Sequence, residues 1–354
     1  MKRFLLTTHR WLGLISGIFL LAIGGSGSIL VYKHEIDRLL HPALYNIDSS
    51  GTRLTLDSLY AIVFARHGEG FASLSFDIPT SADTPVEFTL SSRGGNFYEI
   101  RHYIVDVHPY TGAILREGDC ADISTSFVHW IMYVHDGARF GNTGMLVVAL
   151  CALIMFLSGI TGLFYYGKRL RSILTFPLRL RGLNASQFLR SLHVYVAVWS
   201  ILLTLVVFFT GFWMAKGIFT GGRWGTASHR KSERIAVSIS ACLATSSAIL
   251  PGFSPDFVDV PLREGGFIEI DGETNARAFF GGGDASSVTF DPRTGGLLGA
   301  VDERSASFPG NIIPAFWALH VGSYGGAFIK MLYAIFGLVP GVLAISGFVM
   351  CRTR

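Results

Sequence analysis

Charge is scarce in this sequence of 354 residues. Only 15% of the residues are Asp, Glu, Lys or Arg, whereas soluble globular domains contain about 25%. Half of the residues are hydrophobic. The low fraction of charged residues and the high fraction of hydrophobic residues exclude an ordinary soluble protein. They predict that much of the chain lies in lipid.

Four stretches contain no charged residue and are long enough to cross a bilayer: Trp11 to Tyr32, Gly144 to Tyr166, Val194 to Ala215 and Met331 to Cys351. A spanning helix needs about 20 apolar residues, so each stretch predicts one transmembrane helix. The first stretch is also longer than the 7–15 apolar residues that are typical of a cleaved signal peptide. We therefore interpret it as a span.

Acidic residues are missing from both termini and from the middle connection. All 25 Asp and Glu lie within residues 33–143 or 216–327. The other connecting pieces hold eleven basic residues: Lys2, Arg3, Arg10, Lys168, Arg169, Arg171, Arg179, Arg181, Arg190, Arg352 and Arg354. Because Lys and Arg accumulate on the cytoplasmic side, both termini and the middle loop are predicted to be cytoplasmic, and the two long segments external. The net charge of +4 therefore reflects orientation in a lipid membrane and indicates no nucleic-acid partner.

The two external segments share a strand-turn-strand pattern, "YIVDVHPYTGAILREGD" and "SSVTFDPRTGGLLGAVD". Pro fixes φ in such a turn and Gly supplies the positive φ. Helices are expected at Leu56 to His67 and Glu233 to Leu250, with strands at Val86 to Leu90 and Phe267 to Ile270. Each segment is therefore predicted to be a small α+β domain with an antiparallel sheet.

These features divide the chain into consecutive parts. They are residues 1–33 (transmembrane helix 1), 34–128 (external domain 1), 129–167 (transmembrane helix 2), 168–190 (basic cytoplasmic loop), 191–216 (transmembrane helix 3), 217–312 (external domain 2) and 313–354 (transmembrane helix 4). The unit of span, external domain and span thus occurs twice.

Cysteine is rare, and neither CxxC nor CxxCH occurs. A zinc knuckle and covalent attachment of a c-type haem are therefore unsupported. Cys120 and Cys242 both lie in the external segments, where disulfides can form. Whether they form a bridge is left open.

Eleven histidines are present, and four of them occupy the ends of spans. His9 and His193 begin the first and third spans, and His135 and His320 precede the second and fourth. Ionisable residues at membrane depth suggest a function. Six further histidines lie in the polar external segments and are expected to be solvated: His34, His41, His67, His102, His108 and His229.

Helix direction groups these four histidines into pairs. His9 and His193 are predicted to share one depth, and His135 and His320 another. Two facing imidazoles are the axial ligands that a six-coordinate haem iron requires, whereas zinc needs three or four ligands. His129 is the alternative to His135, although the glycine spacing shared with His320 favours His135.

Other residues near the pairs fit the same hypothesis. His9, Gly13 and Gly17 recur at helical spacing on one face, which would leave room for a flat macrocycle. Four cations near the histidines could pair with haem propionates or simply extend toward the membrane boundary: Arg10, Arg139, Arg190 and Lys330.

At these residues the chain resembles the PepSY-associated transmembrane family, which includes siderophore reductases of the ferrioxamine B reductase type. The resemblance covers nearly the whole chain and rests on "HRWLGLISGIFLLAIGGSGSILVYKHEID", "WIMYVH", "GITGLFYY", "LRSLHVYVAVWSILL", "LHVGSYGG" and the two Pro-x-Thr-Gly turns. It implies an α-helical membrane protein of the bacterial inner membrane, with four transmembrane helices and two small α+β PepSY-like periplasmic domains. His108 in the first turn, where the second has Asp291, departs from this pattern.

The resemblance also implies a function. It predicts two haem b groups, with His9 and His193 holding iron on the cytoplasmic side and His135 and His320 on the periplasmic side. A ferric siderophore would be reduced in the periplasm. No nucleotide-binding signature occurs, so a quinol or a redox protein is expected to supply the electrons. A quinol-linked redox partner of another protein and a non-enzymatic receptor or protease regulator are the alternatives.

Overall fold

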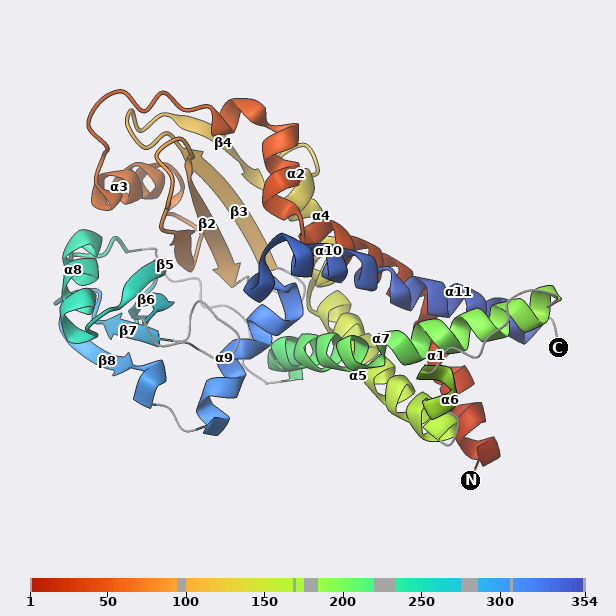
Figure 1. The fold of residues 1–354 in the computed structure, drawn as a ribbon. Helices are drawn as coiled ribbons and strands as arrows, with labels where there is room; N and C mark the ends of the chain where they lie inside the picture. The colour runs from red at the N-terminus through yellow and green to blue at the C-terminus, as the bar shows by residue number, and fades with distance from the viewer. Residues whose placement is uncertain are drawn as a thin grey trace. The chain divides into compact units, whose positions relative to one another are not determined.

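The structure, a computed structural model, describes residues 2–93, 100–167, 170–174, 184–219, 233–274, 286–305 and 308–352 (Figure 1). Several residues discussed above lie outside these ranges: Lys168, Arg169, Arg179, Arg181, His229 and Arg354. The chain forms two compact units. The membrane unit comprises Met1–Tyr32, Ile131–Arg223 and Leu319–Arg354, and the sheet unit comprises Lys33–Trp130 and Trp224–Ala318.

The membrane unit is built from long apolar helices. They are α1 (Lys2–Leu30), α5 (Gly141–Tyr166), α7 (Ala185–Ala215) and the consecutive pair α10 (Gly326–Gly337) and α11 (Val339–Arg352). Within the described residues, four segments are long and apolar enough to cross a membrane: Arg3–Leu30, Ala138–Tyr165, Ala185–Ala215 and Ser323–Arg352. These are the four spans that the sequence predicts, and Pro340 at the start of α11 accounts for the break in the last one.

Two of the spans are preceded by a separate helix. Helix α4 (Phe127–His135) precedes α5 and α9 (Phe308–Val321) precedes α10, with the short 3₁₀ turns η2 (Ala138–Phe140) and η7 (Ser323–Gly325) between them. Gly137 and Gly141 at the first break have φ of 79° and 60°, and Gly322 and Gly326 at the second have 74° and 63°. Glycine adopts these left-handed conformations without steric cost. The repeated glycine spacing therefore ends one helix just after His135 and another just after His320, before the next helix begins.

Helix α7 ends at Ala215 as predicted but begins earlier than the predicted boundary. Asn184 caps this helix in a capping box with Gln187, each side chain accepting a hydrogen bond from the backbone N–H of the other residue. Residues 185–190, which the sequence assigned to the middle loop, are therefore helical. The remaining helical pieces of the membrane unit are α6 (Leu170–Leu174) and η4 (Lys216–Phe219).

The sheet unit contains one antiparallel sheet of eight strands in the order β4-β3-β2-β1-β5-β6-β7-β8. The first segment supplies β1 (Ser73–Asp77), β2 (Val86–Arg93), β3 (Ile100–Val107) and β4 (Ile114–Asp119). The second supplies β5 (Ser254–Pro261), β6 (Ile268–Glu273), β7 (Ser286–Phe290) and β8 (Leu297–Val301). Helices α2 (Lys33–Leu40), α3 (Leu56–His67) and α8 (Ile239–Ile249), with the 3₁₀ turns η1 (Pro42–Tyr45) and η6 (Glu303–Ser305), complete the unit.

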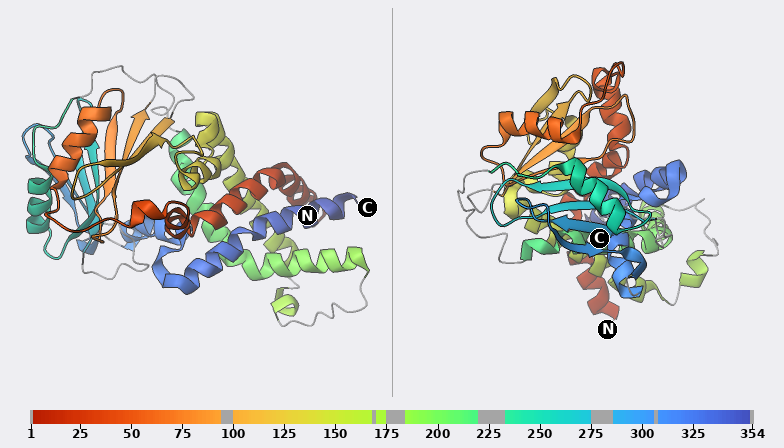
Figure 2. Two further views of the ribbon diagram at one scale, coloured as in Figure 1. Left: turned by 90° about the horizontal axis from the view of Figure 1, so that it is seen from above. Right: turned by 90° about the vertical axis from the view of Figure 1, so that its left-hand side faces the viewer.

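The two halves of this sheet meet at β1 and β5, which pair antiparallel with Ser75 opposite Asp259. Figure 2 shows α3 and α8 next to each other on the same face of the sheet. Residues of both helices and of both strand sets share one hydrophobic core, including Leu59, Phe88 and Ile270. The sequence predicts two separate domains, whereas the structure has one sheet and one core.

Side-chain hydrogen bonds also join the halves. The Asp57 carboxylate of α3 accepts hydrogen bonds from the backbone N–H of Ile239 at 2.6 Å and from the Ser238 hydroxyl at 3.0 Å. An acidic residue at a helix N-terminus stabilises the helix, so the first segment caps a helix of the second. Cys120 and Cys242 are both buried free thiols, and the structure contains no bridge between them.

Candidate functional site

His9 and His193 form the first of two imidazole pairs in the membrane unit. Their ring centroids are 6.4 Å apart, with the ring planes inclined at 84°. His9 lies in the first turns of α1 and His193 in the first turns of α7. The two residues that helix direction groups together are thus close neighbours in the structure.

His135 and His320 form the second pair. Their ring centroids are 6.1 Å apart and the ring planes are inclined at 54°. His135 is the last residue of α4, and His320 lies at the end of α9. The glycine-dependent breaks that follow both helices therefore fix where these two imidazoles are placed.

Each of the four rings is held by a hydrogen bond at Nδ1. The backbone carbonyl oxygens of Ser158, Ile23 and Val207 accept from His9 at 3.0 Å, from His135 at 2.9 Å and from His320 at 3.1 Å, respectively. His193 Nδ1 lies 2.8 Å from the hydroxyl oxygen of Ser346. That hydroxyl itself donates to Val342, so it accepts from His193.

These hydrogen bonds determine the tautomer. A carbonyl oxygen can only accept, so Nδ1 carries the proton and Nε2 of the neutral ring keeps its lone pair. Among the described residues, no hydrogen bond reaches Nε2 of any of the four. Metal-bound histidines show this arrangement, because the hydrogen bond orients the ring and increases its basicity as a ligand.

A glycine on a neighbouring helix lies against each ring. A Cβ added at Gly27 would be 3.0 Å from Cε1 of His135, and one added at Gly211 would be 2.9 Å from Cε1 of His320. The corresponding distances are 3.3 Å from Gly162 to His9 and 3.6 Å from Gly347 to His193. The absence of a side chain at these positions therefore lets each imidazole approach the helix backbone.

A hydroxyl residue precedes each of these glycines: Ser26-Gly27, Thr161-Gly162, Thr210-Gly211 and Ser346-Gly347. Ser26 and Thr210 lie 3.1 Å and 3.2 Å from Nδ1 of the histidines that they contact. Thr161 instead donates to the Ser158 carbonyl that His9 uses. Sequence reasoning missed these dipeptides as site residues, although every span contains at least one Ser/Thr-Gly dipeptide.

The spacing of these residues repeats along the chain. His9 and Gly27 are 18 residues apart on α1, and His193 and Gly211 are 18 residues apart on α7. Eighteen residues make five turns of an α-helix, so each histidine and glycine share one face, and they are about 27 Å apart along the axis. From His135 to Gly162, and likewise from His320 to Gly347, there are 27 residues.

This repeat defines two halves of the membrane unit. In each half the histidine of one helix lies against the glycine of the other, and each imidazole pair takes one ring from each half. The two pairs therefore lie at opposite ends of α1 and of α7. Their separation of about 27 Å is close to the thickness of roughly 30 Å of a bilayer's hydrocarbon core.

The ring separations fit a metal held between two imidazoles. A metal–imidazole bond is about 2 Å long and the bonding nitrogen lies roughly 1.2 Å from the ring centre, so two such rings on opposite sides of a metal have centroids about 6.4 Å apart. The observed 6.4 Å and 6.1 Å agree with this value. No group of three or more His, Cys, Asp or Glu in the described ranges could hold an ion. A metal at these pairs would therefore need in-plane donors from a macrocycle such as haem.

A cavity of about 310 Å³ lies beside the first pair. His9, His193 and Gly13 line it, and a Cβ added at Gly13 would meet no atom within 4 Å. Gly17 instead packs against Ala344, 3.3 Å from where its Cβ would be. Of the predicted row of glycines, Gly13 thus faces the open space and Gly17 serves helix packing.

Two of the four cations near the histidines also line this cavity, namely Arg10 and Arg190. Lys330 instead lies over the ring of Tyr32, with its ammonium 5.9 Å from the ring centroid, and Arg139 is exposed. From the sequence, all four cations have the same interpretation, whereas in the structure two of them line the cavity and two do not. Of these four cations, Arg10 and Arg190 are placed where they could contact an anionic group bound beside the first pair.

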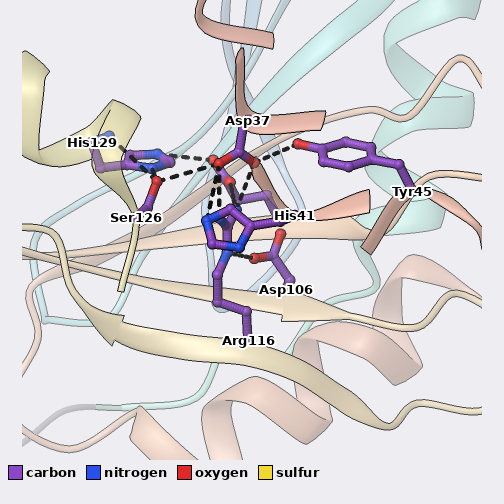
Figure 3. A network of polar contacts seen from close by, with 8 residues as sticks. Asp37, His41, Tyr45, Asp106, Arg116, Ser126 and His129 are labelled. Atoms are coloured by element: carbon purple, nitrogen blue, oxygen red, sulfur yellow. Dashed lines mark hydrogen bonds and ion pairs between the residues drawn. The ribbon is translucent and has the colours of Figure 1, made fainter. Parts of the chain in front are cut away.

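His129, the alternative to His135, has different neighbours. Its Nε2 lies 3.2 Å from the carboxylate of Glu87, and its Nδ1 lies 2.9 Å from the Ser126 hydroxyl. Figure 3 shows His129 and Ser126 beside Asp37 and above Arg116, within the sheet unit. Both ring nitrogens of His129 are thus engaged in a polar network, and the ring belongs to neither imidazole pair.

The four apolar spans and the paired histidines define a multi-pass membrane protein with two imidazole pairs, each ring held by a hydrogen bond at Nδ1. The model of the PepSY-associated TM region matches residues 6–354. The chain therefore belongs to the PepSY-associated transmembrane family. No protein of curated function matches it significantly.

Proposed function

We propose that this protein is a di-haem b electron carrier of the bacterial inner membrane that reduces ferric siderophores in the periplasm. One observation carries the proposal: two pairs of imidazoles have their Nδ1 atoms anchored and their ring centroids 6.4 Å and 6.1 Å apart. Haem, when bound, supplies a one-electron iron couple whose potential depends on its axial ligands, hydrogen bonding and burial.

The residues of the chain have separate roles in this proposal. His9 and His193 would be the axial ligands of one haem, and His135 and His320 those of the other. The carbonyls of Ser158, Ile23 and Val207 and the hydroxyl of Ser346 orient the rings. The guanidinium groups of Arg10 and Arg190 would bind the propionates beside the first pair.

The orientation of the two imidazole pairs in the membrane follows from the charge distribution. The basic termini and middle loop favour a cytoplasmic position for the ends of α1 and α7 that carry His9 and His193. His135 and His320 would then face the periplasm. A membrane quinol or a redox protein would supply the electrons. The acceptor would be Fe(III) in a chelator, which gains one electron and becomes Fe(II).

Haem content tests the proposal most directly. The purified protein should contain about two haems per chain, with a low-spin spectrum in the reduced state. His9→Ala and His320→Ala should each remove about one haem. His129→Gln is the matched control and should retain both, because its ring lies in the network with Glu87. A protein without haem, or one that keeps both haems in His9→Ala, would exclude an electron carrier of this kind.

The acceptor requires a separate measurement. The reduced protein should be reoxidised when ferrioxamine B is added, with release of Fe(II) that a ferrous chelator detects. Reoxidation by oxygen but not by ferrioxamine B would instead favour a redox partner of another protein. Loss of haem without any effect on the function of the cell would favour a receptor or regulator.

A further inference from the structure

A buried network of charged side chains lies in the sheet unit, apart from the imidazole pairs. The guanidinium of Arg116 on β4 donates to Asp106 on β3 at 2.5 Å and to Asp37 on α2 at 2.9 and 3.1 Å. It also reaches Glu87 on β2 at 3.2 Å. The side chains of Asp106, Asp37 and Arg116 are 1%, 7% and 8% exposed, so these charges are well shielded from water.

The network extends to the first turn of α4. His129 bonds to the second oxygen of the Glu87 carboxylate, and the Ser126 hydroxyl lies 3.5 Å from Asp37. Ser126 also accepts a hydrogen bond from the backbone N–H of His129. Tyr45 of η1 donates to Asp37 at 2.6 Å. In Figure 3 Asp37 lies between Tyr45 on one side and the Ser126–His129 pair on the other.

The formal charges of this network do not balance without a proton. Three carboxylates face one guanidinium and one imidazole, so one negative charge is left over even when His129 is protonated. An uncompensated buried charge is strongly unfavourable. One further proton on a carboxylate removes the excess. Lys33 and Asp77 both face Glu87 and carry opposite charges, so together they leave this balance unchanged. His41, Tyr45 and Cys120 also face the network.

The second half of the duplicated chain lacks several of these residues but keeps a carboxylate at one position, since Glu269 lies opposite Thr289 as Glu87 lies opposite Asp106. When the two Pro-x-Thr-Gly turns are aligned, Asp106 corresponds to Thr289 and Arg116 to Gly299. When His135 and His320 are aligned, His129 corresponds to Pro314. The second half thus builds its strands and its helix α9 without the network. The strands of a half therefore form without the complete network, so the network adds something that this part of the fold alone does not need.

The pKa values of three members differ strongly from the ordinary ones. Burial and the neighbouring Glu87 carboxylate raise the pKa of Asp106 to about 7, against the lowering effect of Arg116. Partial burial opposes ionisation of Glu87, whose side chain is still 36% exposed, but His129 and Arg116 outweigh it and lower the pKa of Glu87 to about 2. Burial lowers the pKa of His129, but Glu87 reverses this and raises it above 6.5.

We propose that Asp37, Glu87, Asp106, Arg116 and His129 form a proton-binding clasp that holds α2 and the first turn of α4 against β2, β3 and β4. With one proton bound to a carboxylate and His129 protonated, the network is neutral and the clasp is closed. Loss of protons leaves excess negative charge and weakens the contacts of Glu87 with His129. The clasp thus determines how firmly the first turn of α4, residues 127–130, is held against the strands of the sheet unit.

The way in which pH changes the stability of the clasp follows from the signs of the pKa shifts of Asp106 and His129. Asp106 has a raised pKa, so the folded network binds more protons than the unfolded chain between pH 3.8 and about 7. The contribution of Asp106 to the stability of the folded network therefore decreases as pH rises through this window. The raised pKa of His129 acts in the same direction above pH 6.5. The clasp is thus strongest in a mildly acidic compartment and weakest at alkaline pH.

Hydrogen–deuterium exchange on the full-length protein tests the clasp without any measurement of haem. After correction for intrinsic exchange rates, the amides of residues 127–130 should be about tenfold less protected at pH about 8 than at pH about 6. Asp106→Asn keeps an acceptor for Arg116 and mimics the protonated acid. It should retain the protection seen at low pH and lose most of its dependence on pH.

The control is Glu117→Gln on the same strand. Arg66, and to a lesser degree His67, lower the pKa of Glu117 to about 2 despite some burial, so its charge does not change in the tested range. This variant should keep the pH dependence of the wild type. Equal protection of residues 127–130 at both pH values in the wild type would overturn the proposal. So would an unchanged pH dependence in Asp106→Asn, and if that variant does not fold, the wild-type measurement still decides.

Discussion

The ring of His135 lies directly against Gly27 of α1. A Cβ at residue 27 would be 3.0 Å from Cε1 and 3.4 Å from Nδ1 of the imidazole. The same helix supplies the carbonyl of Ile23 that accepts from Nδ1. One turn of α1 therefore both orients the imidazole and leaves the space that it occupies.

Enlarging this glycine should remove one redox site. Gly27→Val places a branched side chain against the His135 ring, and the haem content should decrease from about two to about one per chain. Gly25→Val is the matched control, because a Cβ at Gly25 would meet no atom within 4 Å. Haem determination on the purified variants measures the difference. Two haems in Gly27→Val would contradict the assignment of His135.

Removing a hydroxyl that supports a ring should weaken the first pair. In Ser346→Ala, Nδ1 of His193 loses the acceptor at 2.8 Å, and the affinity for haem should decrease by roughly 10- to 100-fold. Ser16→Ala is the control, since Ser16 is also buried and donates one turn back, to Leu12 at 2.7 Å, but contacts no imidazole. Haem transfer to apomyoglobin reports the affinity. Equal transfer from the two variants would count against this role of Ser346.

Breaking the buried network should destabilise the protein. Arg116→Met leaves the carboxylates of Asp37 and Asp106 without their cation, and a loss of about 3–5 kcal/mol is expected. Arg66→Met removes an exposed ion pair with Glu117 and should cost far less, because solvent screens an exposed pair. Denaturant-induced unfolding of the full-length protein compares the two variants. Similar losses in both would show that the network contributes no more than a surface pair.

Acid should also destabilise the sheet unit. The pKa values of Glu87 and Glu117 are lowered to about 2 by their cationic neighbours. A lowered pKa gives stability that is complete above the ordinary value and is lost as pH falls toward the folded value. The melting temperature should therefore decrease between pH about 4 and about 2, and less steeply in Glu117→Gln. A melting temperature that rises over this range would contradict the assigned ion pairs.

The spans and histidine pairs could be predicted because they depend on local composition. A charge-free run such as Gly144 to Tyr166 has few alternatives to a spanning helix, and α5 (Gly141–Tyr166) ends at the predicted residue. Alternation of span direction then places His9 near His193. The positive φ of Gly137 and Gly322 explains why the glycine spacing after His135 and His320 was informative.

The merging of the two sheets could not be predicted in the same way. Each half has a complete strand pattern, and the edge pairing of β1 with β5 connects residues about 180 positions apart. Nothing local in Ser73–Asp77 marks it as a central strand. The role of His129 was missed for a related reason, since its partner Glu87 is distant in sequence.

The division of each imidazole pair between the two halves sets an order on the biogenesis of the protein. His193 leaves the ribosome 184 residues after His9, and His320 follows His135 by 185 residues. At bacterial rates of translation, each early imidazole waits roughly ten to forty seconds for its partner. During that interval neither imidazole pair is complete, so no metal can bind between two histidine rings. Under the proposed function, haem binding by both rings of a pair would therefore follow synthesis of the second half, and a chain truncated in the middle loop would contain neither complete pair.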